Sequence, residues 1–164
     1  MRLGHMKSAL LVAASVAIAT LTPGGAQAAV KDGQQFGDWI ARCDATGKIC
    51  RVMQMQVADG GARLFEISLG KIGPKGELGV ITIVPLGVRI PPGVAFQADG
   101  KQTNMPILQC MPNGCQAGIP LDDAGLKALE KTKNFMLGMQ DASGKTVTMA
   151  ISTKGLSDAI QAIK

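Results

Sequence analysis

The four cysteines fall into two close pairs, and this spacing constrains the fold more than any other feature of the chain. Cys110 and Cys115 enclose Met111-Pro112-Asn113-Gly114, which places proline and glycine where a type I turn prefers them. Cys43 and Cys50 enclose a slightly longer loop. Because opposed residues of a hairpin bring their Cβ atoms within disulfide reach, we predict the disulfides Cys43–Cys50 and Cys110–Cys115. Each would stabilise its hairpin by roughly 2–2.5 kcal/mol.

Two other arrangements of the cysteines stay open at the level of sequence. Four cysteines allow three disulfide connectivities, and the spacing favours the hairpin pairs without eliminating the other two. A zinc site is the alternative to disulfides, but these spacings, without a histidine beside them, fit zinc ligation poorly. Cysteines held in disulfides are not available as nucleophiles.

The start of the chain has the three regions of a secretory signal. A basic beginning precedes an uncharged apolar run from Ala9 to Leu21. Pro23-Gly24-Gly25 follows, and then Ala26-Gln27-Ala28, whose small residues form a signal-peptidase site. The apolar run is too short to span about 30 Å of hydrocarbon as a helix. We therefore expect a signal peptide at residues 1–28, a mature domain at residues 29–164 and an oxidising compartment.

The mature chain is mildly basic and has no histidine or tyrosine. Without Arg2 and Lys7, 15 basic residues remain against 12 acidic ones, a net charge of +3. The excess is scattered, whereas nucleic-acid binders carry a clustered basic face, often with stacking aromatic residues. His5, the one histidine, lies in the signal. We predict no nucleic-acid partner. Because no later stretch is long enough for a membrane-spanning helix, we expect a soluble or peripherally attached protein.

Short β-branched segments alternate with glycine, proline and asparagine along the mature chain, a pattern typical of one all-β domain. Residues 78–84, LGVITIV, are nearly all apolar and are predicted to form a central strand, whereas the alternation in residues 64–69 predicts one solvent-exposed face. The predicted strands are Phe36–Cys43, Ile49–Val57, Leu64–Leu69, Leu78–Val84, Val94–Ala98, Pro106–Cys110, Cys115–Ile119, Phe135–Gln140 and Thr146–Ser152.

Two segments break this pattern and are predicted to be helices. Leu121–Lys131 has Asp122 and Asp123 near its start, where carboxylates suit the helix dipole. The apolar residues of Leu156–Ile163 follow the i, i+3, i+4, i+7 spacing of one helix face. This second helix is expected to cap one end of a two-sheet sandwich.

Several short motifs, in their order and spacing, carry a family resemblance. They are Phe36-Gly37-Asp38-Trp39 with Cys43 and Cys50, Pro85-Leu86-Gly87-Val88, Ile90-Pro91-Pro92-Gly93-Val94, the turn between Cys110 and Cys115, Pro120-Leu121-Asp122-Asp123 and Lys154-Gly155-Leu156. Together they resemble the invasion-associated locus B family of exported bacterial proteins over nearly the whole mature chain. The resemblance implies an immunoglobulin-like β-sandwich, here with one or two short helices and the two local disulfides, in a Gram-negative envelope. For some members it implies a link to entry into host cells, red blood cells in particular, but it implies no reaction.

An antibody-like disulfide between the sheets is one alternative that such a fold raises. Cys43 and Cys110 lie 67 positions apart, close to the spacing of the bridge in antibody domains. Trp39, however, precedes the first cysteine, whereas the antibody pattern places its tryptophan between the two. The hairpin pairing therefore remains the prediction, and Trp39 is expected to pack in the core.

The mature chain offers few residues for catalysis. A Ser-His-Asp or Cys-His site cannot be built without histidine. Asp122 and Asp123 form the one adjacent acidic pair, and their expected role is at a helix N-terminus. We predict no enzymatic activity, no catalytic residue and no cofactor.

Met53 and Met55 offer one alternative, a metal site. Residues two apart in a strand point to the same side, so both thioethers could meet a soft ion such as Cu(I). Met105 and Met111 would add ligands if the fold brought them close. Filling of the core, which methionine does well, is the favoured expectation.

Residues 85–96, PLGVRIPPGVAF, are the strongest candidate for a recognition surface. Pro91 and Pro92 are expected to impose a stiff, extended backbone that cannot donate to a sheet. Arg89 lies among apolar neighbours, where its guanidinium could anchor a carboxylate or phosphate of a partner. The candidate partner-binding residues are therefore Arg89, Ile90, Pro91 and Pro92. A plain crossover between sheets, with Arg89 in solvent, is the favoured alternative.

Three functions fit these observations. The first is a non-enzymatic binding or structural protein of the envelope, with a protein partner in the envelope or on a host cell. The second is a periplasmic Cu(I) carrier that uses Met53 and Met55. The third is a periplasmic chaperone or enzyme inhibitor. An exported chain of this kind fits either the periplasm or the cell surface.

Overall fold

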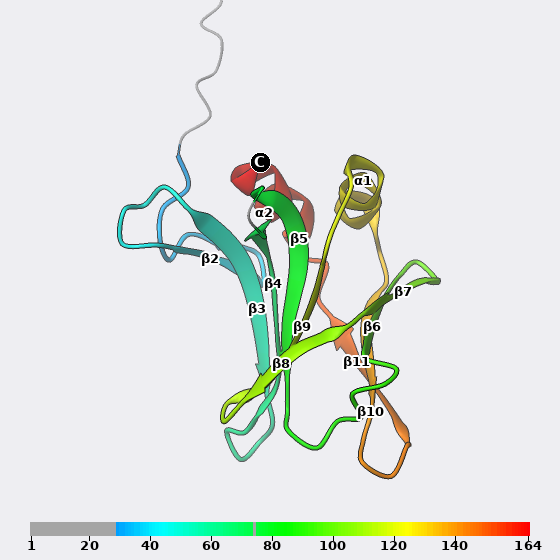
Figure 1. Cartoon of the computed structure of the whole chain (residues 1–164). Helices are drawn as coiled ribbons and strands as arrows, with labels where there is room; N and C mark the ends of the chain where they lie inside the picture. The colour runs from blue at the N-terminus through cyan, green and yellow to red at the C-terminus, as the bar shows by residue number, and fades with distance from the viewer. Residues whose placement is uncertain (1–28, 74) are drawn as a thin grey trace, which may run out of the picture.

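The computed structural model describes residues 29–73 and 75–164, and the predicted signal peptide lies outside them. The described chain forms two antiparallel sheets and two short helices (Figure 1), which confirms the β-sandwich predicted from the sequence. Its strands are β1 Gln35–Phe36, β2 Trp39–Cys43, β3 Cys50–Val57, β4 Arg63–Ile72, β5 Glu77–Val84, β6 Val94–Ala98, β7 Lys101–Met105, β8 Ile107–Met111, β9 Gly114–Pro120, β10 Phe135–Gln140 and β11 Thr146–Ile151. The helices are α1 Asp123–Lys131 and α2 Leu156–Ile163.

The large sheet has seven strands in the order β1-β2-β3-β4-β5-β9-β8. The apolar run LGVITIV lies in β5, between β4 and β9, so the prediction of a central strand is confirmed. The single strand predicted over Phe36–Cys43 is wrong. Gly37 has a φ of +58°, which turns the chain back so that Phe36 of β1 pairs with Trp39 of β2. Glycine reaches this region at no steric cost because it lacks Cβ.

The predicted solvent-exposed face of residues 64–69 is also partly wrong. Ser68 is only 4% exposed, although it belongs to the polar side of the alternation. Its neighbours in the sheet are Met53 on β3 and Ile81 on β5. The longer side chains of Met53 and Ile81 lie on either side of the short Ser68 side chain, each directly opposite it on a neighbouring strand, and this accounts for the burial of Ser68.

The small sheet has four strands in the order β11-β10-β6-β7. Strand β7 has no counterpart among the predicted strands, because its sequence KQTNM is mainly polar. A hairpin forms it nevertheless. The expected turn at Asp99-Gly100 has φ values of +45° and +86°, the two positive angles of a type I′ turn, and it pairs Ala98 of β6 with Lys101 of β7.

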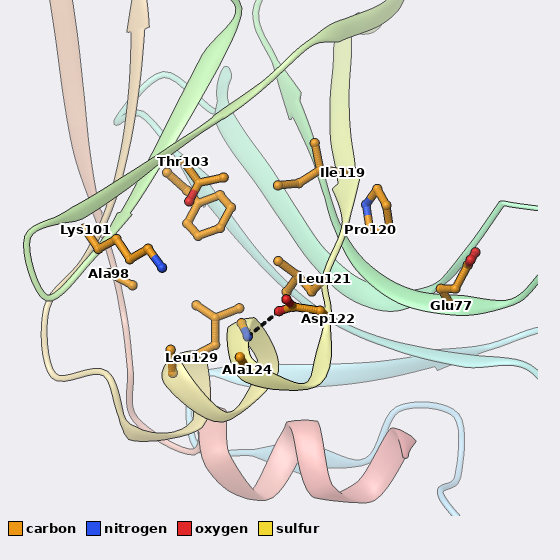
Figure 2. Close-up of a pocket in the computed structure, with 13 residues that line it drawn as sticks. Glu77, Ala98, Lys101, Thr103, Ile119, Pro120, Leu121, Asp122, Ala124 and Leu129 are labelled. Atoms are coloured by element: carbon orange, nitrogen blue, oxygen red, sulfur yellow. Dashed lines mark hydrogen bonds between the residues drawn. The ribbon is translucent and has the colours of Figure 1, made fainter.

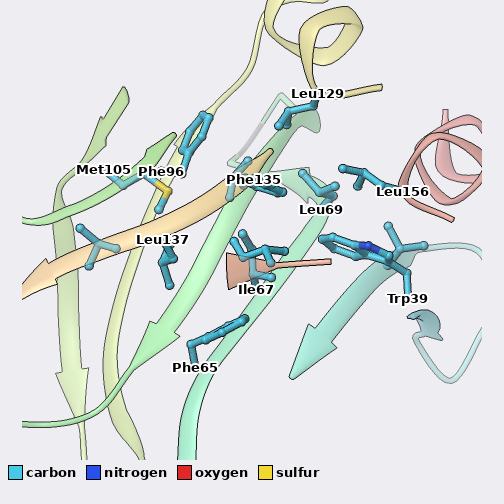
Figure 3. Packing of buried hydrophobic residues seen from close by; sticks show 14 of the residues in the cluster. Trp39, Phe65, Ile67, Leu69, Phe96, Met105, Leu129, Phe135, Leu137 and Leu156 are labelled. Atoms are coloured by element: carbon cyan, nitrogen blue, oxygen red, sulfur yellow. The ribbon is translucent and has the colours of Figure 1, made fainter. Parts of the chain in front are cut away.

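The core lies between the two sheets, and the helices close it at one end (Figures 1 and 3). Trp39 is buried in it, as expected. The rings of Phe96 and Phe135, on neighbouring strands of the small sheet, meet edge to face with centroids 6.0 Å apart. Leu129 of α1 and Leu156 of α2 extend the core at the helical end (Figure 3).

Both predicted disulfides are confirmed. Cys43–Cys50 joins β2 to β3, and Cys110–Cys115 joins β8 to β9. In both hairpins the two cysteines are direct partners in the strand register, which is the geometry that the loop lengths predict. The sequence-level alternatives of zinc ligation and an inter-sheet bridge are therefore excluded.

Candidate functional site

Residues 85–93, here called the crossover segment, connect β5 of the large sheet to β6 of the small sheet at the end of the sandwich opposite α1 (Figure 1). The expected crossover is thus confirmed. Arg89 is exposed, and its apolar neighbours Leu86 and Ile90 are 56% and 60% exposed. The expectation of an extended backbone at Pro91-Pro92 is wrong, because residues 90–92 form a turn with a cis bond between the prolines. The ring of proline fixes the backbone angle φ, but the fixed value of φ occurs in turns as well as in extended chains.

The crossover segment is attached to the turn between β10 and β11. The backbone N–H of Arg89 donates to Gln140 O at 2.9 Å, and Val88 forms a bridge with Asp141. The guanidinium of Arg89 lies close to that turn, since a Cβ built on Gly144 would be 2.9 Å from its Nη1. Within residues 29–73 and 75–164, Arg89 forms no ion pair.

The carboxylate of Asp141 is held by its own turn. Its Oδ1 accepts hydrogen bonds from the Ser143 hydroxyl at 2.6 Å and from the Lys145 amide at 3.0 Å. The Ser143 hydroxyl and the turn amides lower the pKa of Asp141 below its usual value. The Asp141 carboxylate is therefore engaged within its own turn, and among the described residues it forms no ion pair with Arg89.

A hollow, here called the α1 groove, lies between α1, the end of β9 and the β6–β7 hairpin (Figure 2). Its volume is about 640 Å³. The apolar lining comes from Phe96, Ala98, Ile119, Leu121, Ala128 and Leu129, while Glu77, Lys101 and Asp122 supply the charged groups. The sequence did not predict this groove, because its lining residues come from three separate stretches of the chain, near residue 77, within 96–103 and within 119–129. The polar sequence of β7 was the one available signal.

Asp122 and Asp123 occupy the helix start, as predicted. Asp122 is the N-cap of α1, and its Oδ1 accepts a hydrogen bond from Gly125 N at 2.7 Å. Asp123 is in the first turn. Because the Asp122 carboxylate is engaged in capping, the pair has the structural role that a helix N-terminus requires.

The four methionines considered for copper do not converge. Met53 and Met55 lie on one strand, β3, where Met53 is half-buried and Met55 is 55% exposed. The expectation that Met55 fills the core is therefore wrong. Met105 is buried in the small sheet and Met111 lies in the β8–β9 hairpin. Residues 29–73 and 75–164 also contain no cluster of three or more His, Cys, Asp or Glu side chains suited to a metal.

Comparison with known proteins identifies the family of this chain. The family model described as Invasion associated locus B (IalB) protein matches residues 39–164. The chain belongs to the invasion associated locus B family. It is 27% identical over 154 residues to the Invasion protein B homolog of Brucella abortus strain 2308, with 90% of this chain and 86% of that protein covered. The homolog from Brucella abortus biovar 1 strain 9-941 matches to the same extent.

The invasion associated locus B fold is also similar to a solved structure. The crystal structure of invasion associated protein b from Bartonella henselae superposes with a TM-score of 0.69 at 23% identity. The superposition covers 79% of this chain and 94% of that chain. At this identity the similarity establishes a shared fold.

Two of the motifs that carry the invasion associated locus B resemblance meet in the structure. The turn at Gly37 packs against the backbone before α2, and Asp38 N donates to Lys154 O at 3.1 Å. A Cβ on Gly155 would lie 2.1 Å from Phe36 O, and one on Gly37 would lie 2.5 Å from Lys154 O. Each glycine therefore permits the backbone approach of the other segment, so this motif pair serves the fold.

Proposed function

We propose that this chain is an exported, non-enzymatic binding protein of the cell envelope that contacts a protein partner through the crossover segment. The observation that carries the proposal is the exposure of Leu86 and Ile90 beside Arg89. Arginine is enriched among the residues that contribute most to protein interfaces, and exposed apolar side chains beside it can be buried in the same contact. A groove of about 190 Å³ that includes Leu64, Leu86, Val88 and Met149 adjoins the segment and offers a place for a partner side chain.

Location and biological context are parts of the same proposal. Export is supported by the predicted signal peptide and by the family to which the chain belongs. A role in host-cell invasion is supported by the names of the Brucella and Bartonella relatives. Residues 29–73 and 75–164 contain no helix long and apolar enough to cross a membrane.

Photo-crosslinking in intact cells tests the binding surface. A benzophenone amino acid replaces Ile90 in one variant and Ile49, which is 58% exposed on the β2–β3 loop, in the matched control. We expect a discrete crosslinked protein from position 90 and none from position 49. Adding Arg89→Ala should weaken that crosslink without changing the thermal midpoint. Equal crosslinking from both positions, or no effect of Arg89→Ala, would remove the crossover segment as the binding surface.

Protease shaving tests where the surface is presented. Loss of the protein from intact cells would place it on the cell surface and support contact with a host cell. Protection until the outer membrane is permeabilised would confine it to the periplasm, and the partner would then be an envelope protein. Retention of the protein in the cytoplasm would contradict export.

A further inference from the structure

Within the described residues 29–73 and 75–164, strand β7 leaves one edge of the small sheet unpaired. It is the last strand of that sheet, and it pairs with β6 through the two-residue turn at Asp99-Gly100. In such a hairpin the closing pair, Ala98 and Lys101, exchanges backbone hydrogen bonds, and the following pairs alternate. The N–H and C=O groups of Gln102 and Asn104 therefore point away from β6.

This free edge borders the α1 groove (Figure 2). The backbone hydrogen bond that joins this part of the chain to the large sheet lies just after β7, where Gly118 N donates to Pro106 O at 3.3 Å. On the other side of the groove, α1 presents Ala124 and Ala128, which are both exposed. Because these side chains are single methyl groups, the helix does not cover the edge of the sheet.

The groove also has an apolar floor and wall. Phe96 and Leu129 are buried core residues that border it, and Ile119 and Leu121 are half-buried beside them. Side chains of a strand placed beside β7 would alternate between the two faces of the small sheet. Those on the inner face would enter the groove, while the backbone would pair with Gln102 and Asn104. An unpaired edge next to an apolar slot is the arrangement used in β-strand addition.

We propose that the α1 groove binds an extended apolar segment of another protein, which adds to the four-stranded sheet beside β7. An acyl chain would fill the apolar slot but would leave the edge groups of β7 unused, so the geometry points to a peptide. The groove and the crossover segment lie at opposite ends of the sandwich (Figure 1), and this proposal goes beyond the function proposed above. Failure at one surface does not imply failure at the other.

Two synthetic peptides test the use of the backbone. The probe is a fluorescein-labelled peptide of alternating valine and threonine with a lysine at each end. The control peptide has the same sequence, but every second backbone amide is N-methylated. This removes the backbone N–H donors along one edge of the peptide and keeps the apolar side chains. We expect fluorescence anisotropy to show binding of the probe and about tenfold or more weaker binding of the control. Absence of probe binding, or equal binding of the two peptides, would overturn the proposal.

A matched pair of variants tests the location. Ala128→Trp places an indole in the groove from the exposed side of α1, and we expect it to weaken probe binding by about tenfold or more. Ala142→Trp makes the same change at an exposed position of the β10–β11 turn and should leave binding unchanged. Equal binding by both variants would overturn the proposal. Binding of oleate in the groove without binding of the peptide would overturn it too, in favour of a lipid ligand.

Amide hydrogen exchange tests the register and needs no variant. Peptide binding should slow exchange at Gln102 and Asn104, whose N–H groups face the added strand. Exchange at Thr103 should change little, because its N–H already faces β6 in the register of the hairpin. Protection that is confined to the crossover segment, or that is absent from β7, would contradict strand addition at this edge.

Discussion

The hydroxyl of Ser152 donates a 2.6 Å hydrogen bond to Oδ2 of Asp38, although 114 residues separate them. The carbonyl of Ser152 accepts the indole N–H of Trp39 at 2.9 Å, and its N–H donates to Oε1 of Gln54 at 3.0 Å. One residue thus joins the β1–β2 turn, β3 and the segment before α2. Because Trp39 is buried, its N–H needs such a partner, and the network fixes the first hairpin to the end of the small sheet.

Gly155→Ala should destabilise the protein by more than the about 1–2 kcal/mol that a left-handed backbone costs a residue with a side chain. The added Cβ would lie 2.1 Å from Phe36 O, so the backbone around the Asp38–Ser152 contact must also shift. Chemical denaturation measures the change. Gly47→Ala is the matched control, because Gly47 has a φ of +69° but nothing within 4 Å of a built Cβ. An equal loss in both variants would contradict a role for the close approach.

Replacing Cys110 and Cys115 together by serine should lower the free energy of unfolding by about 2 kcal/mol, because the short loop gains freedom mainly in the unfolded chain. The same double replacement at Cys43 and Cys50, which close a slightly longer loop, should cost slightly more. Denaturant titration of the oxidised proteins measures both losses. Unchanged midpoints would show that the strand pairing alone stabilises these hairpins.

Asp99 is expected to make folding sensitive to acid. Its Oδ1 accepts hydrogen bonds from the backbone amides of Asn134 at 2.9 Å and Lys133 at 3.0 Å. These hydrogen bonds lower the pKa of Asp99 from the ordinary 3.8, and the bond from Asn134 has the larger effect. A lowered folded-state pKa means that the carboxylate stabilises the fold above pH 3.8, and this stabilisation is lost as pH falls through the folded value.

The variant Asp99→Asn separates this charge effect from the turn itself, since asparagine tolerates the positive φ of the position. We expect it to be less stable than the wild type at neutral pH and nearly equal to it in strong acid. Thermal melts across the acidic range make the comparison. A stability difference that stays constant with pH would contradict the assignment to the carboxylate.

Cu(I) affinity should not depend on Met53 and Met55. The two thioethers belong to one strand, whereas Met105 is buried in the other sheet, so a complete set of soft ligands does not assemble. Titration under reducing conditions of the wild type and of a variant with both residues changed to leucine measures the contribution. A clear loss of affinity in the double variant would restore the copper-carrier alternative.

Local pattern predicted the parts of this fold that depend on short-range chemistry. The loops inside Cys43–Cys50 and Cys110–Cys115 specify hairpins, and Asp122 marks the start of α1 because a carboxylate can cap free amides there. Prediction from the local pattern failed where contacts with residues distant in sequence decide whether a segment forms a strand or a side chain is buried. KQTNM became β7 because β6 offered a partner, and Ser68 is buried because longer side chains flank it.

The sequence by itself indicated the two hairpins that carry the cysteines, favoured the pairs Cys43–Cys50 and Cys110–Cys115 and placed Arg89 in an apolar segment, because these features follow from residues close together in the chain. Only the tertiary structure decided which surfaces stay open. The α1 groove exists because α1 presents methyl groups across from the unpaired edge of β7. The Asp38–Ser152 contact likewise joins residues that approach each other only after both sheets have packed, because two glycines let the backbones come together.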